Sequence, residues 1–173
     1  GDPFDDAIAA GEGAAFAANY KIEDEIGDNF QLGYRTSAGR GVTLDVAVFH
    51  NRIKNYQFGE AFQSEEGDRV FSAIEEATFQ GFEIGARIDS HPLVGGPWNV
   101  FAEATYTYTD SEIKKNEGNP GTKGNEVPEA IKHYANLTLG LAYAKLWDVS
   151  VSATHRGGWF VDDENTVGFE FDE

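Results

Sequence analysis

Hydrophobic and polar residues alternate along several stretches of this chain. Between Trp98 and Tyr108 every second side chain is apolar or aromatic, whereas most of the side chains between them, from Asn99 to Thr107, are polar. A period of two is typical of a β-strand with one apolar and one polar face. The same period recurs and predicts six strands, at residues 28–37, 41–56, 76–89, 97–110, 132–144 and 146–160.

The connections between the predicted strands alternate in length. We expect tight turns around residues 38–40, 90–96 and 144–146, and long connections at 57–75 and 111–131. Short turns at one end of an antiparallel meander and long loops at the other are the pattern of outer-membrane β-barrels, whose turns face the periplasm. The chain is therefore predicted to be all-β, an antiparallel meander that forms part of a large transmembrane barrel.

A soluble β-sandwich or barrel would show the same alternation, since its apolar face would form the core. Two features favour the membrane barrel. The predicted strands have about ten or more residues, against the usual five or six. The apolar face also ends in aromatic side chains, which suit the two membrane interfaces. The expected interface aromatics are Trp98, Tyr106, Tyr108, Tyr143, Trp147 and Trp159.

The opposite face carries charged residues in mid-strand, together with small Gly and Ser residues. This composition suits a wide polar lumen better than an ordinary solvent-facing surface. The charged residues of this face are Arg35, Glu83, Arg87, Glu103 and Arg156.

The chain is acidic, with 13 Lys and Arg against 30 Asp and Glu and a formal charge of -17. This balance argues against nucleic-acid binding, which requires a basic surface. Most acidic residues lie in the predicted long loops and terminal segments, so the acidity does not argue against membrane insertion. The exceptions in strands or short turns are Asp45, Glu83, Asp89, Glu103 and Asp148.

Six strands cannot close a membrane barrel, because the smallest bacterial barrels have eight. An open sheet edge in lipid would leave backbone groups unpaired. Either further strands lie outside this sequence or several chains share one barrel, and we favour a fragment. No run of about 18 apolar residues occurs, so no transmembrane helix is expected.

Five segments resemble the barrel of TonB-dependent receptors, especially the ferric citrate and siderophore receptors, and they follow one another along the chain in the order found in that family. Gly124 to His133 resembles a loop-to-strand stretch that often reads Gly-Asn-x-x-Pro-x-x-Pro-x-His, with Ile131 in place of the second Pro. Gly157 to Thr166 resembles the exit Gly-x-x-aromatic-x-Asp-x-x-Asn-Thr. The other three segments are residues 29–36, 41–58 and 77–84.

The family fold is a 22-stranded barrel with a plugged lumen. The resemblance implies that residues 1–173 are a fragment of the barrel domain, with the plug, the TonB-contacting segment and the final strands outside it. It implies a location in the outer membrane and, as partners, membrane lipid, TonB and an iron chelate.

The implied function is TonB-dependent active transport of an iron chelate, a siderophore or ferric citrate, across the outer membrane. The alternatives are a passive porin, TonB-dependent uptake of cobalamin or a carbohydrate, and a barrel that uses its loops for adhesion or catalysis. Arg35, Arg87 and Arg156 could contact an anionic chelate in the lumen, or could pair with Glu83, Glu103 and plug residues.

Signatures of other chemistry are weak. No motif of a metalloprotease, an α/β-hydrolase or a phosphate loop occurs, and no enzyme activity or cofactor is expected. The four histidines are scattered, and the chain has no Cys, so no metal site is indicated. The acidic run Asp162 to Asn165 contains oxygen ligands of the kind that Ca²⁺ uses, but a solvated outer loop is the preferred interpretation.

Overall fold

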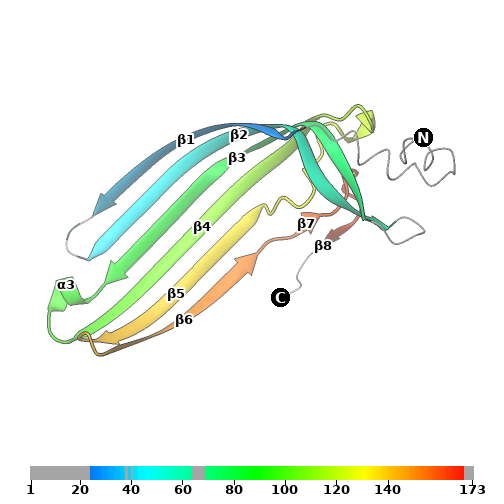
Figure 1. Ribbon diagram of the computed structural model, residues 1–173. Helices are drawn as coiled ribbons and strands as arrows, with labels where there is room; N and C mark the ends of the chain where they lie inside the picture. The colour runs from blue at the N-terminus through cyan, green and yellow to red at the C-terminus, as the bar shows by residue number, and fades with distance from the viewer. Residues whose placement is uncertain (1–23, 38, 40, 64–68, 170–173) are drawn as a thin grey trace, which may run out of the picture.

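The computed structural model describes residues 24–37, 39, 41–63 and 69–169, and its main feature is a six-stranded antiparallel sheet (Figure 1). The strands pair in chain order, as a meander. This confirms the predicted fold class. The strands are β1 (Ile26–Ser37), β2 (Val42–Gln63), β3 (Arg69–Asp89), β4 (Trp98–Lys115), β5 (His133–Tyr143) and β6 (Trp147–Arg156).

Besides the six-stranded sheet, the described chain contains four short elements. The helix α3 (His91–Val94) lies between β3 and β4, and the 3-10 helix η1 (Pro120–Thr122) lies between β4 and β5. After β6, the strands β7 (Trp159–Phe160) and β8 (Gly168–Phe169) pair with each other as a separate small sheet. No helix in the described part of the chain is long and apolar enough to cross a membrane.

Short and long connections lie at opposite ends of the sheet, as predicted (Figure 1). We call these the short-turn end and the loop end. The turn between β1 and β2 depends on glycine, because Gly39 and Gly41 have φ angles of 75° and 78°. A Cβ atom on Gly41 would also lie 2.3 Å from the carbonyl oxygen of Asp89. Gly41 thus lets the first turn pass against the end of β3.

The strand register keeps the apolar and polar positions on separate faces. On one face, Leu32 lies opposite Val48, which in turn lies opposite Phe82. On the other face, Glu103 lies between Arg87 of β3 and Thr138 of β5. Because side chains alternate along a strand, these rows extend into two whole faces. We call them the apolar face and the polar face.

Strand lengths differ from the prediction at three places. The expected long loop at 57–75 was wrong, because β2 and β3 continue as a paired hairpin to Gln63 and Arg69. The strand β4 likewise continues to Lys115. Backbone hydrogen bonds can extend a hairpin without a periodic side-chain pattern, so alternation underestimates such strands. The sixth strand ends at Arg156 rather than near residue 160.

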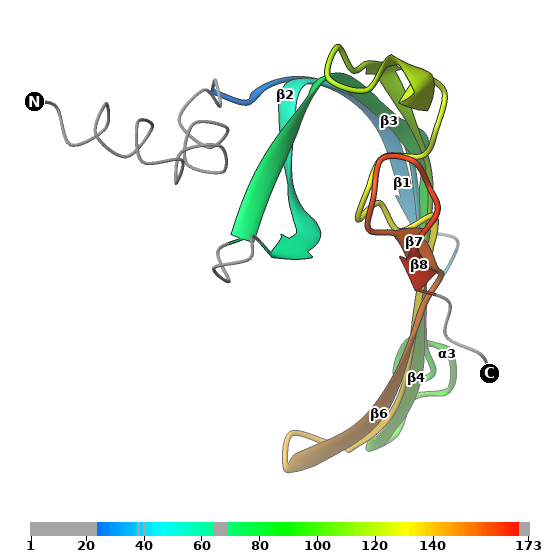
Figure 2. The same cartoon turned by 90° about the vertical axis from the view of Figure 1, so that its right-hand side faces the viewer.

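Seen edge-on in Figure 2, the strands form a thin curved wall, from which the outer parts of β2 and β3 bend away. The wall has no layer packed over either face in the described chain, and every residue of β6 is exposed. The buried core lies instead at the loop end. Its fully buried hydrophobic residues are Ile74, Ala77, Ile113 and Val127, with Tyr56, Phe79 and Ala130 packed against them.

Candidate functional site

Aromatic side chains mark the short-turn end of the apolar face. Trp98 of β4 contacts Tyr143 of β5 and Trp147 of β6, with ring centroids 4.7 Å and 5.7 Å apart. The β5–β6 turn brings Tyr143 and Trp147 together at 6.2 Å. Three of the six predicted interface aromatics therefore form one cluster, at the level where an aromatic belt is expected.

A second aromatic group lies near the loop end of the same face. The ring of Phe82 stacks against Tyr108 at 5.6 Å and lies 5.9 Å from Tyr106. The hydroxyl of Tyr106 is 2.8 Å from Nδ1 of His133. Trp159 lies outside the six-stranded sheet, because it belongs to β7 and packs against Phe169 of β8 at 5.6 Å.

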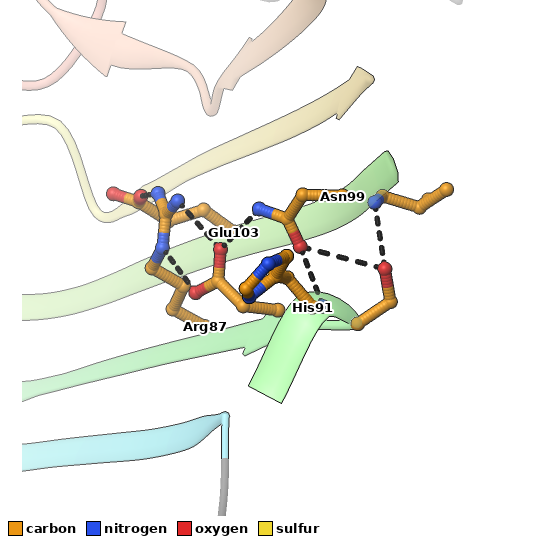
Figure 3. Close-up of polar contacts among 7 residues, drawn as sticks. Arg87, His91, Asn99 and Glu103 are labelled. Atoms are coloured by element: carbon orange, nitrogen blue, oxygen red, sulfur yellow. Dashed lines mark hydrogen bonds and ion pairs between the residues drawn. The ribbon is translucent and has the colours of Figure 1, made fainter. Parts of the chain in front are cut away.

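The polar face carries an arginine network at its short-turn end (Figure 3). The guanidinium of Arg87 donates to both carboxylate oxygens of Asp89, at 2.8 Å and 3.0 Å, and to Oε2 of Glu103 at 2.8 Å. Asn99 donates to Asp89 at 3.0 Å and accepts from the backbone N–H of His91 at 2.8 Å. These bonds use most of the donors of Arg87 and tie the wall to the turn that carries α3.

An aromatic ring continues this network across the wall. The guanidinium of Arg87 lies 4.6 Å from the ring centroid of Phe101, within the range of a cation–π contact. The ring in turn covers Gly140 of β5, where an added Cβ atom would lie 2.0 Å from Cζ of Phe101. Gly140 is therefore needed for close approach, and Phe101 fills the space that its missing side chain leaves.

The other two predicted arginines have different surroundings. Arg35 of β1 forms an ion pair with Asp45 of β2, and Gln31 donates to Glu83 at 3.5 Å. Arg156 of β6 lies over the ring of Tyr134 of β5, with 6.0 Å between the guanidinium carbon and the ring centroid. By register, Arg35 lies near the short-turn end and Arg156 at the opposite end of the wall. The structure does not gather the three arginines into one site.

Two segments, residues 111–131 and 157–169, join at the loop end, and we call them the outer-loop cluster. The first segment begins with the last residues of β4. Asn165 holds Glu126 by two hydrogen bonds, accepting from its N–H at 2.8 Å and donating to its carbonyl at 2.9 Å. Asn116 donates to a carboxylate oxygen of Asp163 at 2.8 Å. Asparagine side chains thus serve as the connectors between segments that are about 40 residues apart in the chain.

The outer-loop cluster rests on the extended hairpin of β2 and β3. The hydroxyl of Tyr56 donates to the carbonyl of Pro128 at 3.3 Å. Burial, followed by the nearby charges of Glu129 and Glu25, raises the pKa of Tyr56 to about 12. The hydroxyl therefore stays protonated and remains a donor at any physiological pH.

Sequence reasoning treated the run from Asp162 to Asn165 as a solvated loop and missed its role. Asp162 accepts hydrogen bonds from the N–H groups of Thr166 and Val167, at 2.8 Å and 2.7 Å, and from the hydroxyl of Thr166 at 2.9 Å. An Asp side chain that bonds backbone groups a few residues further on is a familiar turn signal, and it could have been recognised. No metal-binding group of three His, Asp or Glu side chains occurs within the described residues.

A family model described as TonB dependent receptor-like, beta-barrel, matches residues 3–172. Among solved structures, the crystal structure of the siderophore receptor PiuA from Acinetobacter baumannii is similar to this chain, with a TM-score of 0.59 and 24% sequence identity. The likeness covers 89% of this chain and 22% of the PiuA chain. At this identity the likeness concerns the fold alone, and this chain spans about a fifth of the length of the PiuA chain.

Proposed function

The chain belongs to the TonB-dependent receptor β-barrel family, and from this premise we propose that the complete protein imports an iron chelate, a siderophore or ferric citrate, across the bacterial outer membrane with energy delivered through TonB. The observation that carries the proposal is the family match over nearly the whole chain. The similar fold of a siderophore receptor supports an iron chelate as the cargo.

The two faces of the wall fit this role. In an outer-membrane barrel the lipid-facing side is apolar and is bounded by aromatic belts, whereas the inner side is polar. The apolar face exposes large side chains such as Leu139 and Val151, which are 54% and 72% exposed in this chain. We assign this face to lipid and the polar face to the lumen. The short-turn end then faces the periplasm and the outer-loop cluster faces the exterior.

We further propose that the protein transports its cargo without changing it chemically. A nucleophilic hydroxyl needs a general base within hydrogen-bonding distance. On the lumen side, Thr138 instead bonds the hydroxyl of Ser152 at 2.8 Å, and Thr154 accepts from Asn136 at 2.9 Å. These contacts give the β5–β6 part of the wall a neutral, hydrogen-bonded surface that suits the passage of a polar ligand.

Growth under iron limitation tests the transport proposal. A strain that lacks the parent gene is supplied with one ferric chelate at a time as the iron source. We expect it to lose growth on one chelate, or on a closely related group, while growth on the others persists. Deleting TonB should abolish growth on the same chelate, and restoring the parent gene should rescue only the first strain.

The rival functions give different outcomes in this experiment. Uptake that depends on the parent gene but persists without TonB would show a passive channel. TonB-dependent uptake of cobalamin or a carbohydrate, with no chelate affected, would replace the iron cargo and leave the transport mechanism standing.

A further inference from the structure

The apolar face carries a shallow groove along β4, near the short-turn end of the wall. Ala102 lines this groove and has a small side chain, whereas its neighbours in the same row are Ile88 of β3 and Leu139 of β5. Neighbouring side chains of one row lie about 5 Å apart, so the two larger residues form the sides of the groove. Further apolar lining comes from Val100, Leu141 and Val149.

The helix α3 closes one end of the groove. Leu93 lines the groove although it belongs to α3 and to no strand, and Figure 1 shows this helix at the end of the sheet. Two hydrogen bonds fix the turn against β4. The hydroxyl of Ser90 accepts from the N–H of Val100 at 2.7 Å, and Asn99 accepts from the N–H of His91 at 2.8 Å. The end wall of the groove is therefore held in place by polar contacts behind it.

The two aromatic groups of the apolar face indicate the depth of the groove in the membrane. Trp98 and Tyr108 are ten residues apart on β4, which corresponds to about 33 Å along the strand. With the usual strand tilt of about 35–45°, this length spans about 25 Å of membrane, the height of the lipid-facing band of an outer-membrane barrel. Val100 and Ala102 lie close to Trp98, so the groove lies within the leaflet at the short-turn end.

The turns at this end have the composition of a membrane–water interface. Val94 of α3 and Leu146 of the β5–β6 turn are exposed apolar residues. Lys145, next to Leu146, is exposed as well. A lysine in such a position can lay its stem along lipid and direct its ammonium group to the headgroups. Apolar side chains beside a cation therefore suit the headgroup layer of a phospholipid leaflet.

We propose that this groove binds one acyl chain of a phospholipid from the periplasmic leaflet. Its lining is apolar, so the methylene groups of an acyl chain are stabilised there by burial. The occupant is a phospholipid because the short-turn end faces the periplasm, and the periplasmic leaflet of the outer membrane consists of phospholipid, whereas lipid A lies in the outer leaflet. This inference rests on the assignment of the apolar face to lipid, which is part of the proposed function, and it is independent of the cargo.

The expected consequence is that one lipid stays on the protein when the surrounding bilayer is removed. The full-length protein is extracted from the outer membrane in a mild detergent, and native mass spectrometry measures the fraction of molecules that retain a phospholipid. We expect the wild type to retain one. Ala102→Leu should lower the retained fraction by about tenfold, because its side chain occupies the space of several methylene groups. Leu93→Ala should lower it less, because it opens only one end of the groove.

Ala153→Leu is the matched control. It makes the same substitution on the same apolar face, where Ala153 lies opposite Leu137 and outside the groove. It should retain phospholipid like the wild type. All three variants change side chains that face lipid or the turn, so they should assemble normally, and heat-modifiable migration of the folded barrel checks this.

The outcomes separate the inference from the proposed function. A wild type without retained phospholipid, or an equal loss in Ala102→Leu and Ala153→Leu, would show that the face meets only exchanging lipid and that the inference is wrong. Retention of lipid A in place of phospholipid would also contradict it. Each of these results leaves transport by the barrel standing. A wild type that is absent from the outer membrane would overturn both.

Discussion

The wall and the outer-loop cluster are built on opposite principles. The wall has regular strands, but its large hydrophobic residues are open on one face, with Val149 61% exposed and Val151 72% exposed. The loop end has less regular structure, yet Ile113 at the end of β4 and Val127 in the following loop are fully buried there. The hydrophobic core of the described chain thus lies at the loop end, where Val127 packs with Ile74 of β3 and Ile113 of β4.

This difference reflects the surroundings in which each region is stable. On the proposed function, lipid covers the apolar face of the wall, and further strands pair with both edges of the sheet. On the same proposal the outer loops face water, where buried apolar area and satisfied polar groups are needed for a fixed shape. The core at the loop end, by contrast, is formed within this chain, by β3, β4 and the loop that carries Val127.

Truncating a side chain of the buried core at the loop end should show the largest difference between the two regions. Ile113→Ala removes a fully buried side chain next to Ile74 and Val127, and such changes cost about 2–5 kcal/mol. We expect the backbone of residues 116–131 to lose protection from hydrogen exchange, while β5 and β6 keep theirs. The control Val149→Ala, on the exposed apolar face, should change neither. Equal loss of protection in β5 and the loops would show that the two regions form one cooperative unit.

The wall should respond to charge according to the face on which it is placed. Leu139 lies in the middle of β5 on the apolar face, and arginine near the bilayer midplane costs about 2–4 kcal/mol. Leu139→Arg should therefore reduce assembly in the outer membrane, measured by the heat-modifiable migration of the folded barrel. Thr138→Arg, one residue away and facing the lumen, should assemble normally. If Leu139→Arg assembles as well as Thr138→Arg, the assignment of the faces is reversed or the sheet is not in lipid.

Cysteine labelling tests the same assignment without adding charge. A Cys at Leu139 should react with a lipid-soluble probe, and a Cys at Thr138 with an aqueous one. Equal aqueous labelling at both positions would contradict a membrane wall.

The wall could be predicted from the sequence because the alternation of side chains within each strand is a local pattern. Alternation from Trp98 to Tyr108 identifies a strand and its two faces without any knowledge of its neighbours. The paired register of β4 with β5 then confirms that Trp98 and Tyr143 share the apolar face. Strand ends were predicted less well. Asn55 in β2 has a φ angle of 54°, which interrupts the regular backbone of the strand, and the hairpin continues beyond it.

The outer-loop cluster could not be predicted in the same way, because its contacts join distant segments. Val127 lies in an irregular segment without a strand or helix periodicity, and its burial depends on Ile74 and Ile113. The double hydrogen bond between Asn165 and Glu126 spans 39 residues. The arginines show the same limit: sequence placed Arg35, Arg87 and Arg156 on one face, but only the register shows that two of them have carboxylate partners.

Removing the hydrogen bonds between the two outer loops should have a smaller effect than truncating the buried core. Asn165→Ala removes both hydrogen bonds to Glu126 and leaves the N–H and carbonyl of Glu126 without these partners, at a cost of about 1–3 kcal/mol. We expect faster proteolysis within residues 157–169 and within 124–131, with chelate transport reduced rather than lost. Asn136→Ala, which removes a hydrogen bond to Thr154 within the wall, should leave proteolysis of the loops unchanged. Faster cleavage of only one of the two segments would show that Asn165 does not couple them.

The smallest expected effect is a pH dependence confined to the outer-loop cluster. Burial opposes ionisation of Asp162, but hydrogen bonds from Thr166, Val167 and Asn165 outweigh it, so the pKa of this carboxyl lies below its usual value. A carboxyl with a lowered pKa in the folded state stabilises that state above its unfolded pKa of about 3.9. The stabilisation is lost as the pH falls through the lower, folded value, because the protonated carboxyl accepts these bonds less well.

Hydrogen exchange of Thr166 and Val167 should therefore stay constant from neutral pH down to about 4, after correction for the intrinsic rate, and protection should fall below that. Asp162→Asn should remove this change and lower protection at neutral pH, because the amide has one acceptor oxygen where the carboxylate has two. The wall provides the internal reference, since the ladder of Thr138 and Ser152 has no titrating group. If protection of β5 falls in parallel with that of Thr166, acid acts on the whole barrel and Asp162 is not its origin.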